Sequence, residues 1–235
     1  MSEEQNIEIP EIEQEPEPSS FKLIFALGLA GLFAGLALVS VYLYTLPMIE
    51  ANKAEALQKA IFEVLPDCAS FKTLELIDGQ LIEVTNEEGK KKKAKGGGEV
   101  PKIFTGFNAN GDFVGFAIPG KEPGFQDIIG VIFGYDASQK TIIGFEVLES
   151  KETPGLGDKI FKDADFQTNF TALAIDPEII SVKKGKKKNP NEVESITGAT
   201  ISSKAIVRLL NNSMEEWRAP IEDYINSNEL SIVKK

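Results

Sequence analysis

Hydroxyl-bearing side chains crowd one segment near the C-terminal end of the chain, residues 195–203, which read SITGATISS. Apolar residues then recur at spacings of three and four, as on one face of a helix: Ile206, Leu209, Leu210, Met214 and Trp217. Thr200 therefore falls at the start of an expected helix, where unpaired N–H groups and the positive end of the helix dipole attract phosphate. Gly198 and Ala199 lack the bulk that would keep a phosphate away. A hydroxyl that only caps the helix is the simpler alternative.

The loop Glu152–Gly157, which reads ETPGLG, could also contact a ligand. It follows an expected strand that ends near Glu149, and its Pro-Gly pair favours a tight turn. Its two glycines would let the backbone approach a flat ligand closely. Glu152, Thr153 and the loop amides could hydrogen-bond a polar heterocycle, and Leu156 could pack on its face. A plain turn between a strand and a helix is the alternative, because Pro-Gly turns are common.

The composition excludes most metal and acid–base chemistry. The chain has 235 residues, a net charge of −11, one cysteine (Cys68) and no histidine. A single cysteine cannot form an intramolecular disulfide or hold an iron–sulfur cluster, and without histidine the usual zinc and haem ligand is missing. We therefore expect no metal site and assign no catalytic residue, so that any redox chemistry must come from an organic cofactor. The acidic charge also argues against a nucleic-acid partner.

The segment 23–46 predicts one membrane span. It contains 24 residues without a charged side chain, enough to cross about 30 Å of hydrocarbon at about 1.5 Å per residue. A cleaved signal peptide is the alternative, but acidic residues precede the run and no small-residue cleavage site follows it. Residues 1–22, with seven Glu in the first 20 positions, are expected to form a disordered tail. Residues 47–66 predict a helical stalk that continues past Pro47 and ends at Pro66.

The remaining residues, 67–235, predict one α+β domain with antiparallel β-hairpins and flanking helices. Each of three expected hairpins has two apolar stretches around a turn signal. They join Leu74–Ile77 to Leu81–Val84, Ile103–Phe107 to Phe113–Ile118, and Asp127–Tyr135 to Thr141–Glu149. Two lysine-rich stretches, 86–99 and 183–191, are expected to be solvated loops, and no role is assigned to them.

Residues 124–217 resemble the FMN-binding domain shared by the G subunit of the Rnf complex and the C subunit of the sodium-translocating NADH:quinone reductase. The resemblance rests on the TGAT tetrapeptide at 197–200, the ETPGLG loop, their order, and the membrane anchor ahead of them. It implies that a flavin transferase, with FAD as donor, joins FMN to Thr200 through a phosphoester, and that the ETPGLG loop lies against the isoalloxazine ring. Glu194 stands where the family motif often has Asp, which keeps the charge. The implied cofactor-binding residues are Glu152, Thr153, Pro154, Gly155, Leu156, Gly157, Thr197, Gly198, Ala199 and Thr200.

The resemblance also implies a place in a larger assembly. The stretch 144–160 and the short chain resemble the G subunit more than the C subunit. The chain would then relay electrons in an ion-translocating ferredoxin:NAD oxidoreductase, with the other subunits of that complex as partners, and would not be catalytic alone. Its soluble domain would lie outside the cytoplasm, anchored in the lipid of the bacterial inner membrane. The alternatives are the quinone reductase C subunit, a stand-alone anchored flavin-binding module, and a non-redox module in which Thr200 only caps a helix.

Overall fold

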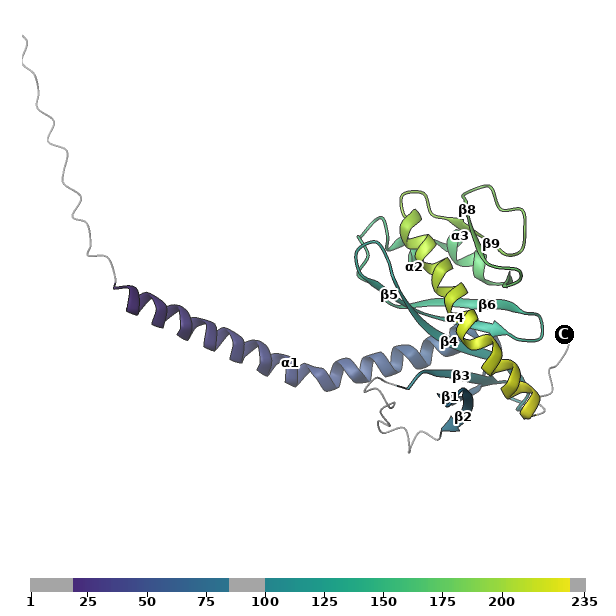
Figure 1. Ribbon diagram of the computed structural model, residues 1–235, viewed down its shortest axis with the longest axis horizontal. Coiled ribbons are helices and arrows are strands. Elements are labelled where there is room, and N and C mark those ends of the chain that lie inside the picture. The colour runs from purple at the N-terminus through teal and green to yellow at the C-terminus, as the bar shows by residue number, and fades with distance from the viewer. Residues whose placement is uncertain (1–18, 85–99, 229–235) are drawn as a thin grey trace, which may run out of the picture. The chain divides into compact units, whose positions relative to one another are not determined.

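The computed structural model describes residues 19–84 and 100–228 of the chain (Figure 1). The chain divides into two compact units, residues 1–52 and residues 53–235. Most of the acidic segment predicted to be a disordered tail lies outside the described residues. The whole of the first lysine-rich stretch, 86–99, also lies outside the described residues.

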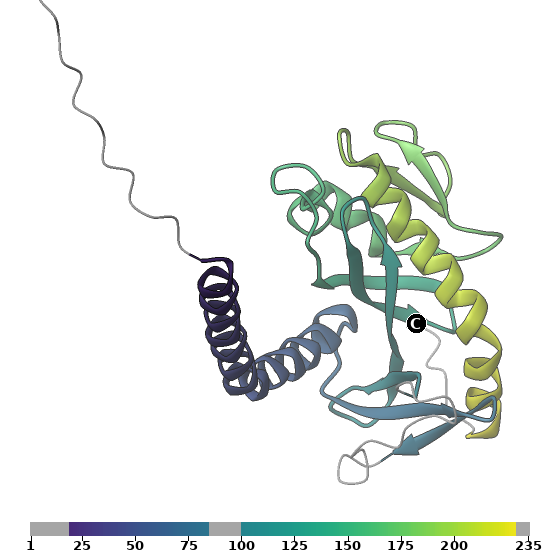
Figure 2. The same ribbon diagram turned by 60° about the vertical axis from the view of Figure 1, so that its left-hand side comes forward.

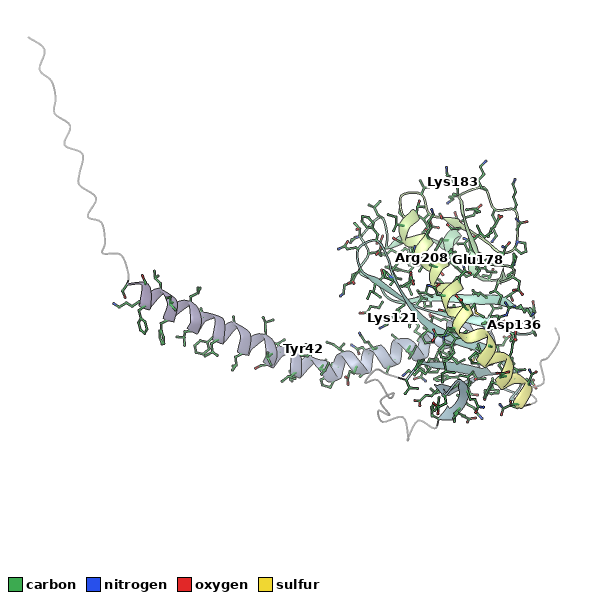
Figure 3. All side chains as sticks on the ribbon, viewed as in Figure 1. Tyr42, Lys121, Asp136, Glu178, Lys183 and Arg208 are labelled. Carbon is green, nitrogen blue, oxygen red and sulfur yellow. The ribbon has the colours of Figure 1, made fainter. Side chains whose placement is uncertain are left out.

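The first helix, α1 (Ser20–Val64), is 45 residues long, and it continues through Pro47. Among the described residues it is the one helix long and apolar enough to cross a membrane. Large apolar side chains between Phe21 and Ile49 are exposed, and Tyr42 is one of them (Figure 3). An exposed apolar surface of this length fits a helix whose surroundings are lipid rather than water.

The second unit is built on one antiparallel sheet of seven strands in the order β2-β1-β3-β4-β5-β6-β7. Its strands are β1 (Ser70–Ile77), β2 (Gln80–Val84), β3 (Lys102–Phe107), β4 (Phe113–Pro123), β5 (Ile128–Asp136), β6 (Thr141–Glu149) and β7 (Leu173–Ala174). The three predicted hairpins are confirmed as β1–β2, β3–β4 and β5–β6. Asp78 and Gly79 adopt φ values of 50° and 83°, which is the left-handed pair that a two-residue hairpin turn requires.

The long C-terminal helix, α4 (Thr200–Ser227), covers one face of this sheet (Figures 1 and 2). All five residues of the predicted apolar face are buried in the core beneath it: Ile206, Leu209, Leu210, Met214 and Trp217. The amphipathic spacing therefore predicted both the helix and the side that packs on the sheet.

The last turns of α1 cover the opposite face of the sheet. Ala60, Ile61 and Val64 pack there with Phe104 and Ile132 in a second, smaller apolar cluster. The sheet thus lies between two helical segments that come from opposite ends of the chain. This layered arrangement confirms the predicted α+β class.

Short elements fill the end of the sheet near the start of α4. They are α2 (Lys159–Lys162), α3 (Ala164–Gln167), the single turn Thr168–Phe170, and the parallel strand pair β8 (Ile180–Lys183) and β9 (Glu192–Ser195). The second lysine-rich stretch runs from the last residue of β8 through the connection to β9, and its residues 183–190 are exposed as expected, whereas Asn191 is buried. The chain leaves β9 directly into residues 197–200, so this strand pair fixes the place where α4 begins.

Candidate functional site

One buried carboxylate joins three segments that are far apart in the sequence. Glu152 Oε1 accepts hydrogen bonds from the backbone N–H groups of Phe125 and Gln126, both at 2.9 Å. Glu152 Oε2 accepts a hydrogen bond from Ser202 Oγ at 2.5 Å. The ETPGLG loop, the turn between β4 and β5, and the first turn of α4 therefore meet at this side chain, which is only 5% exposed.

The surroundings of Glu152 favour its charged form. Burial raises the pKa of the Glu152 carboxyl, but the hydrogen bonds from Ser202 and from the backbone of the turn lower it by more, so the pKa lies below its ordinary value. The group is therefore a carboxylate at neutral pH. Both oxygens accept hydrogen bonds from donors within the chain, so Glu152 has a structural role where the three segments meet.

Each glycine of the site is required for a different structural reason. A Cβ on Gly157 would lie 2.6 Å from Glu152 Oε2 and 2.7 Å from Glu152 Cβ, so this glycine makes room for the carboxylate. Gly155 has a φ of +79° and open space around its Cβ position, so it serves the turn and leaves one side of the loop free. Gly198 has a φ of +85°, and the nearest atom to its Cβ position is Leu156 Cδ2 at 3.7 Å. The two predicted cofactor-binding segments therefore meet at Leu156 and Gly198.

The hydroxyl of Thr200 does not cap its helix. Ala199 is the N-cap residue of α4, no side chain makes a capping hydrogen bond there, and Thr200 is the first helical residue. Thr200 is exposed, and within the described residues its hydroxyl has no hydrogen-bond partner. Ser203 Oγ instead accepts from the Ile196 N–H at 3.1 Å and donates to the Ala199 carbonyl at 2.9 Å, which closes the turn before the helix.

An uncovered apolar surface surrounds the start of α4. Phe125 is 63% exposed, Leu156 50% and Ile201 53%. Each of these side chains comes from one of the three segments that Glu152 joins. Beside them, Asp158 Oδ1 is buried without a hydrogen-bond partner in the described part of the chain. Exposed apolar side chains with a few fixed polar groups are what a flat, partly polar ligand needs.

The site is an open surface rather than an enclosed cavity. A small cavity of about 190 Å³ lies against Thr197, lined also by Lys159, Asp163 and Glu194. A larger groove of about 710 Å³ runs between the sheet, the last turns of α1 and the middle of α4, and none of the ten predicted site residues lines it. A ligand bound at Thr200 would thus keep one side accessible to partners.

Sequence reasoning missed part of this arrangement. The turn residues Phe125 and Gln126 and the helix residue Ser202 all bind Glu152, and none of them belongs to the predicted set. The Pro-Gly-Phe run at 123–125 is a turn signal between two strands and could have pointed to the turn. Nothing in the sequence indicates that Glu152, 27 positions away, accepts the hydrogen bond from the Phe125 N–H.

Replacing Gly157 with Ala should destabilise the protein by about 1–3 kcal/mol, as overpacking of a closed site does. The added methyl group would meet Glu152 Cβ, which cannot swing aside because it is attached to the backbone. Urea unfolding followed by the emission of Trp217, the only tryptophan, measures the change. Gly155→Asn is the matched control, because its side chain has open space and asparagine tolerates a positive φ. Equal unfolding midpoints for the two variants would contradict the crowding at Gly157.

Known proteins resemble this chain over most of its length. The FMN-binding domain family matches residues 124–215. The G subunit of the Na(+)-translocating ferredoxin:NAD(+) oxidoreductase complex of Acetobacterium woodii is 30% identical over 203 residues, which cover 84% of this chain and 93% of the relative. The G subunit of the ion-translocating oxidoreductase complex of Methanosarcina acetivorans is 28% identical over 208 residues, which cover 88% and 95% of the two chains.

A solved structure has the same fold. The C subunit of the Na(+)-translocating NADH-quinone reductase of Parabacteroides distasonis superposes with a TM-score of 0.50 at 24% identity, over 64% of this chain and 76% of that one. The relatives are redox subunits of multisubunit complexes, and α1 supplies a candidate membrane anchor. Its FMN-binding domain follows that anchor in the sequence, and the chain belongs to the family of G subunits of Rnf-type ion-translocating oxidoreductase complexes.

Proposed function

We propose that this chain relays electrons within an Rnf-type complex through an FMN joined by a phosphoester to Thr200. The observation that carries the proposal is the Thr200 hydroxyl, which is exposed, unpartnered within the described residues, and placed on the first residue of a 28-residue helix. It lies inside the region that matches the FMN-binding domain. A helix start without a side-chain cap leaves N–H groups for the phosphate oxygens.

The residues around Thr200 fit FMN. The first turn of α4 would hold the phosphate, and the exposed Leu156 would lie against the ring. Gly155 leaves space on the same loop. Bound FMN supplies the electron transfer itself, which no side chain of this protein can supply. The chain's own part is to hold the ring in one orientation and to leave one side open to its redox partners.

A flavin transferase would install the cofactor, and the geometry suits that reaction. Transfer of FMN from FAD forms a bond between Thr200 Oγ1 and the FMN phosphorus, breaks the pyrophosphate P–O bond of FAD so that AMP leaves, and releases the hydroxyl proton. Such a reaction needs a hydroxyl that an enzyme can reach. Among the hydroxyls at the start of α4, Ser202 and Ser203 are buried and hydrogen-bonded within the chain, whereas Thr200 is open.

The finer assignment to ferredoxin and NAD follows the A. woodii relative, whose name states that activity. On this proposal the chain takes electrons from one member of the complex and passes them to another. Purifying the complex from its natural membrane and following reduction of its flavin by ferredoxin, with and without this chain, tests the assignment. A flavin on Thr200 that ferredoxin does not reduce in the intact complex would exclude it.

The predicted topology is a single span at 23–46, with residues 1–22 in the cytoplasm and the domain after Pro66 on the outer side of the bacterial inner membrane. Reporter fusions placed directly after Pro66 measure it, and we expect activity only from a reporter that works outside the cytoplasm. A matched fusion within the first 20 residues should give the opposite result. A cytoplasmic signal from the Pro66 fusion would reverse the orientation.

A further inference from the structure

The turn Gly124–Asp127 between β4 and β5 is held firmly by the predicted flavin-binding loop. Glu152 Oε1 accepts the N–H groups of Phe125 and Gln126 at 2.9 Å each. Thr153 Oγ1 donates to Gln126 Oε1 at 2.9 Å. A backbone hydrogen bond from the first residue of the turn to its last, at 2.9 Å, closes it. A turn with this many fixed groups presents its remaining side chains in one orientation.

Helix α4 holds the strand that leads into the same turn. Arg208 Nε lies 3.0 Å from Glu122 Oε1, and Arg208 Nη2 donates to the Pro123 carbonyl at 3.0 Å. Arg208 on α4 and Lys121 on β4 are both labelled in Figure 3. The turn is therefore tied to the helix that starts at Thr200 and to the ETPGLG loop, and has a fixed place relative to both.

Phe125 stands out because a turn fixed by several hydrogen bonds leaves most of its ring exposed. The residue is 63% exposed, although burying a phenylalanine side chain is worth about 1.5–3 kcal/mol. Leu156 and Ile201 are exposed on the two neighbouring segments, and the Glu152 carboxylate joins all three. The match to the FMN-binding domain begins at residue 124, so the turn is its first element. The turn that carries Phe125 is thus joined through Glu152 to the first turn of the helix that begins at Thr200.

We infer that Phe125 contacts the isoalloxazine ring of the flavin carried on Thr200, and that Glu152 is the positioning residue that holds Phe125 there. This inference rests on the proposed function and extends it to a part of the site outside both sequence motifs. Glu152 is assigned a positioning role because its oxygens accept hydrogen bonds from Phe125, Gln126 and Ser202. It acts through the turn.

The test uses the full chain, co-expressed with a flavin transferase and purified in detergent, with the substitution Phe125→Ala. The variant should keep its denaturation-resistant flavin, since Thr200 is intact. Its flavin should lose most of its visible circular dichroism and shift its visible absorption band, because an apolar side chain that orients the ring and shields it from water is gone. Ile82→Ala, which removes an exposed apolar side chain of β2, is the control and should change neither signal.

Glu152 variants test the positioning role. Glu152→Ala should change the flavin's circular dichroism in the same direction as Phe125→Ala. Glu152→Gln should restore most of the native signal, because its amide oxygen can still accept both backbone N–H groups. Combining Glu152→Ala with Phe125→Ala should add little to the single substitutions, since both act on one contact. Equal signals for the Ala and Gln variants, or fully additive effects, would overturn the positioning role.

The outcomes separate this inference from the proposed function. A native protein without covalent flavin would contradict the proposed function, and the inference with it. A native protein that carries flavin on Thr200, together with a Phe125→Ala variant of unchanged circular dichroism and absorption, would contradict only the inference. If the same variant, purified as part of the complex from its natural membrane, instead loses other members of the complex with its flavin signals unchanged, Phe125 contacts a protein partner and the inference is wrong.

Discussion

Replacing Thr200 with Val should abolish the flavin that stays on the protein after denaturation. The substitution removes one oxygen and keeps the β-branched shape of the side chain, so α4 should still begin at the same residue. Thr200 is exposed and its hydroxyl makes no hydrogen bond within the described residues, so the folded protein loses no internal contact. The expected result is complete loss of the fluorescent band on a denaturing gel, at unchanged yield of protein.

Thr197→Val is the matched control for that experiment. Thr197 is also exposed, but it precedes the left-handed Gly198 and lies three residues before the helix begins. It therefore lacks the N–H groups of a helix start. We expect the Thr197 variant to keep covalent flavin, and tryptic mass spectrometry of the native protein to find the added FMN mass on the peptide that contains Thr200. Flavin that persists in the Thr200 variant would place the attachment elsewhere.

Much of the fold follows from short-range patterns in the sequence. The apolar spacing from Ile206 to Trp217 requires a helix with one buried face, and Asp78-Gly79 requires a tight hairpin turn. Both patterns act between residues a few positions apart, so a single sequence displays them. The segment after Phe71 could be read as an α+β domain for the same reason.

The assembly of the site could not be read in this way. Glu152 binds partners 27 and 50 positions away, and only the folded sheet brings them together. The sequence predicts Glu152 as a hydrogen-bonding partner of the cofactor but does not indicate that this carboxylate is buried, because a carboxylate beside a Pro-Gly turn is usually exposed. Its burial depends on Gly157 and on Ser202, whose contribution becomes visible only once α4 is in place. The attachment at Thr200 and the ring contacts remain predictions for the experiments above.

The close approach of α1 to the sheet is a second feature that the sequence did not reveal. Gly134 on β5 and Gly144 on β6 are paired neighbours, and the backbone of Val64 sits directly on them. A Cβ on Gly144 would lie 2.6 Å from Val64 Cα and would also contact the Val64 carbonyl. The three atoms nearest to this Cβ position are all backbone atoms of Val64, so no side chain could move to relieve the clash. The two glycines therefore form a side-chain-free surface on which the last turn of α1 packs.

Gly144→Ala should accordingly destabilise the protein by about 1–3 kcal/mol or more, because the added Cβ clashes with the backbone of Val64. Unfolding of the full chain in detergent, followed by the emission of the buried Trp217, measures the loss. Gly130→Ala is the control. That glycine lies on β5 as well, but its nearest neighbour, Glu149 Cβ, is 3.5 Å from the Cβ position, an ordinary contact. Alanine is also no worse than glycine in a strand interior, so this variant should unfold at the native midpoint or slightly above it. If Gly144→Ala unfolded at the same midpoint as Gly130→Ala, the close contact between the Val64 backbone and the sheet would be absent. The last turn of α1 would then pack on the sheet through its side chains alone.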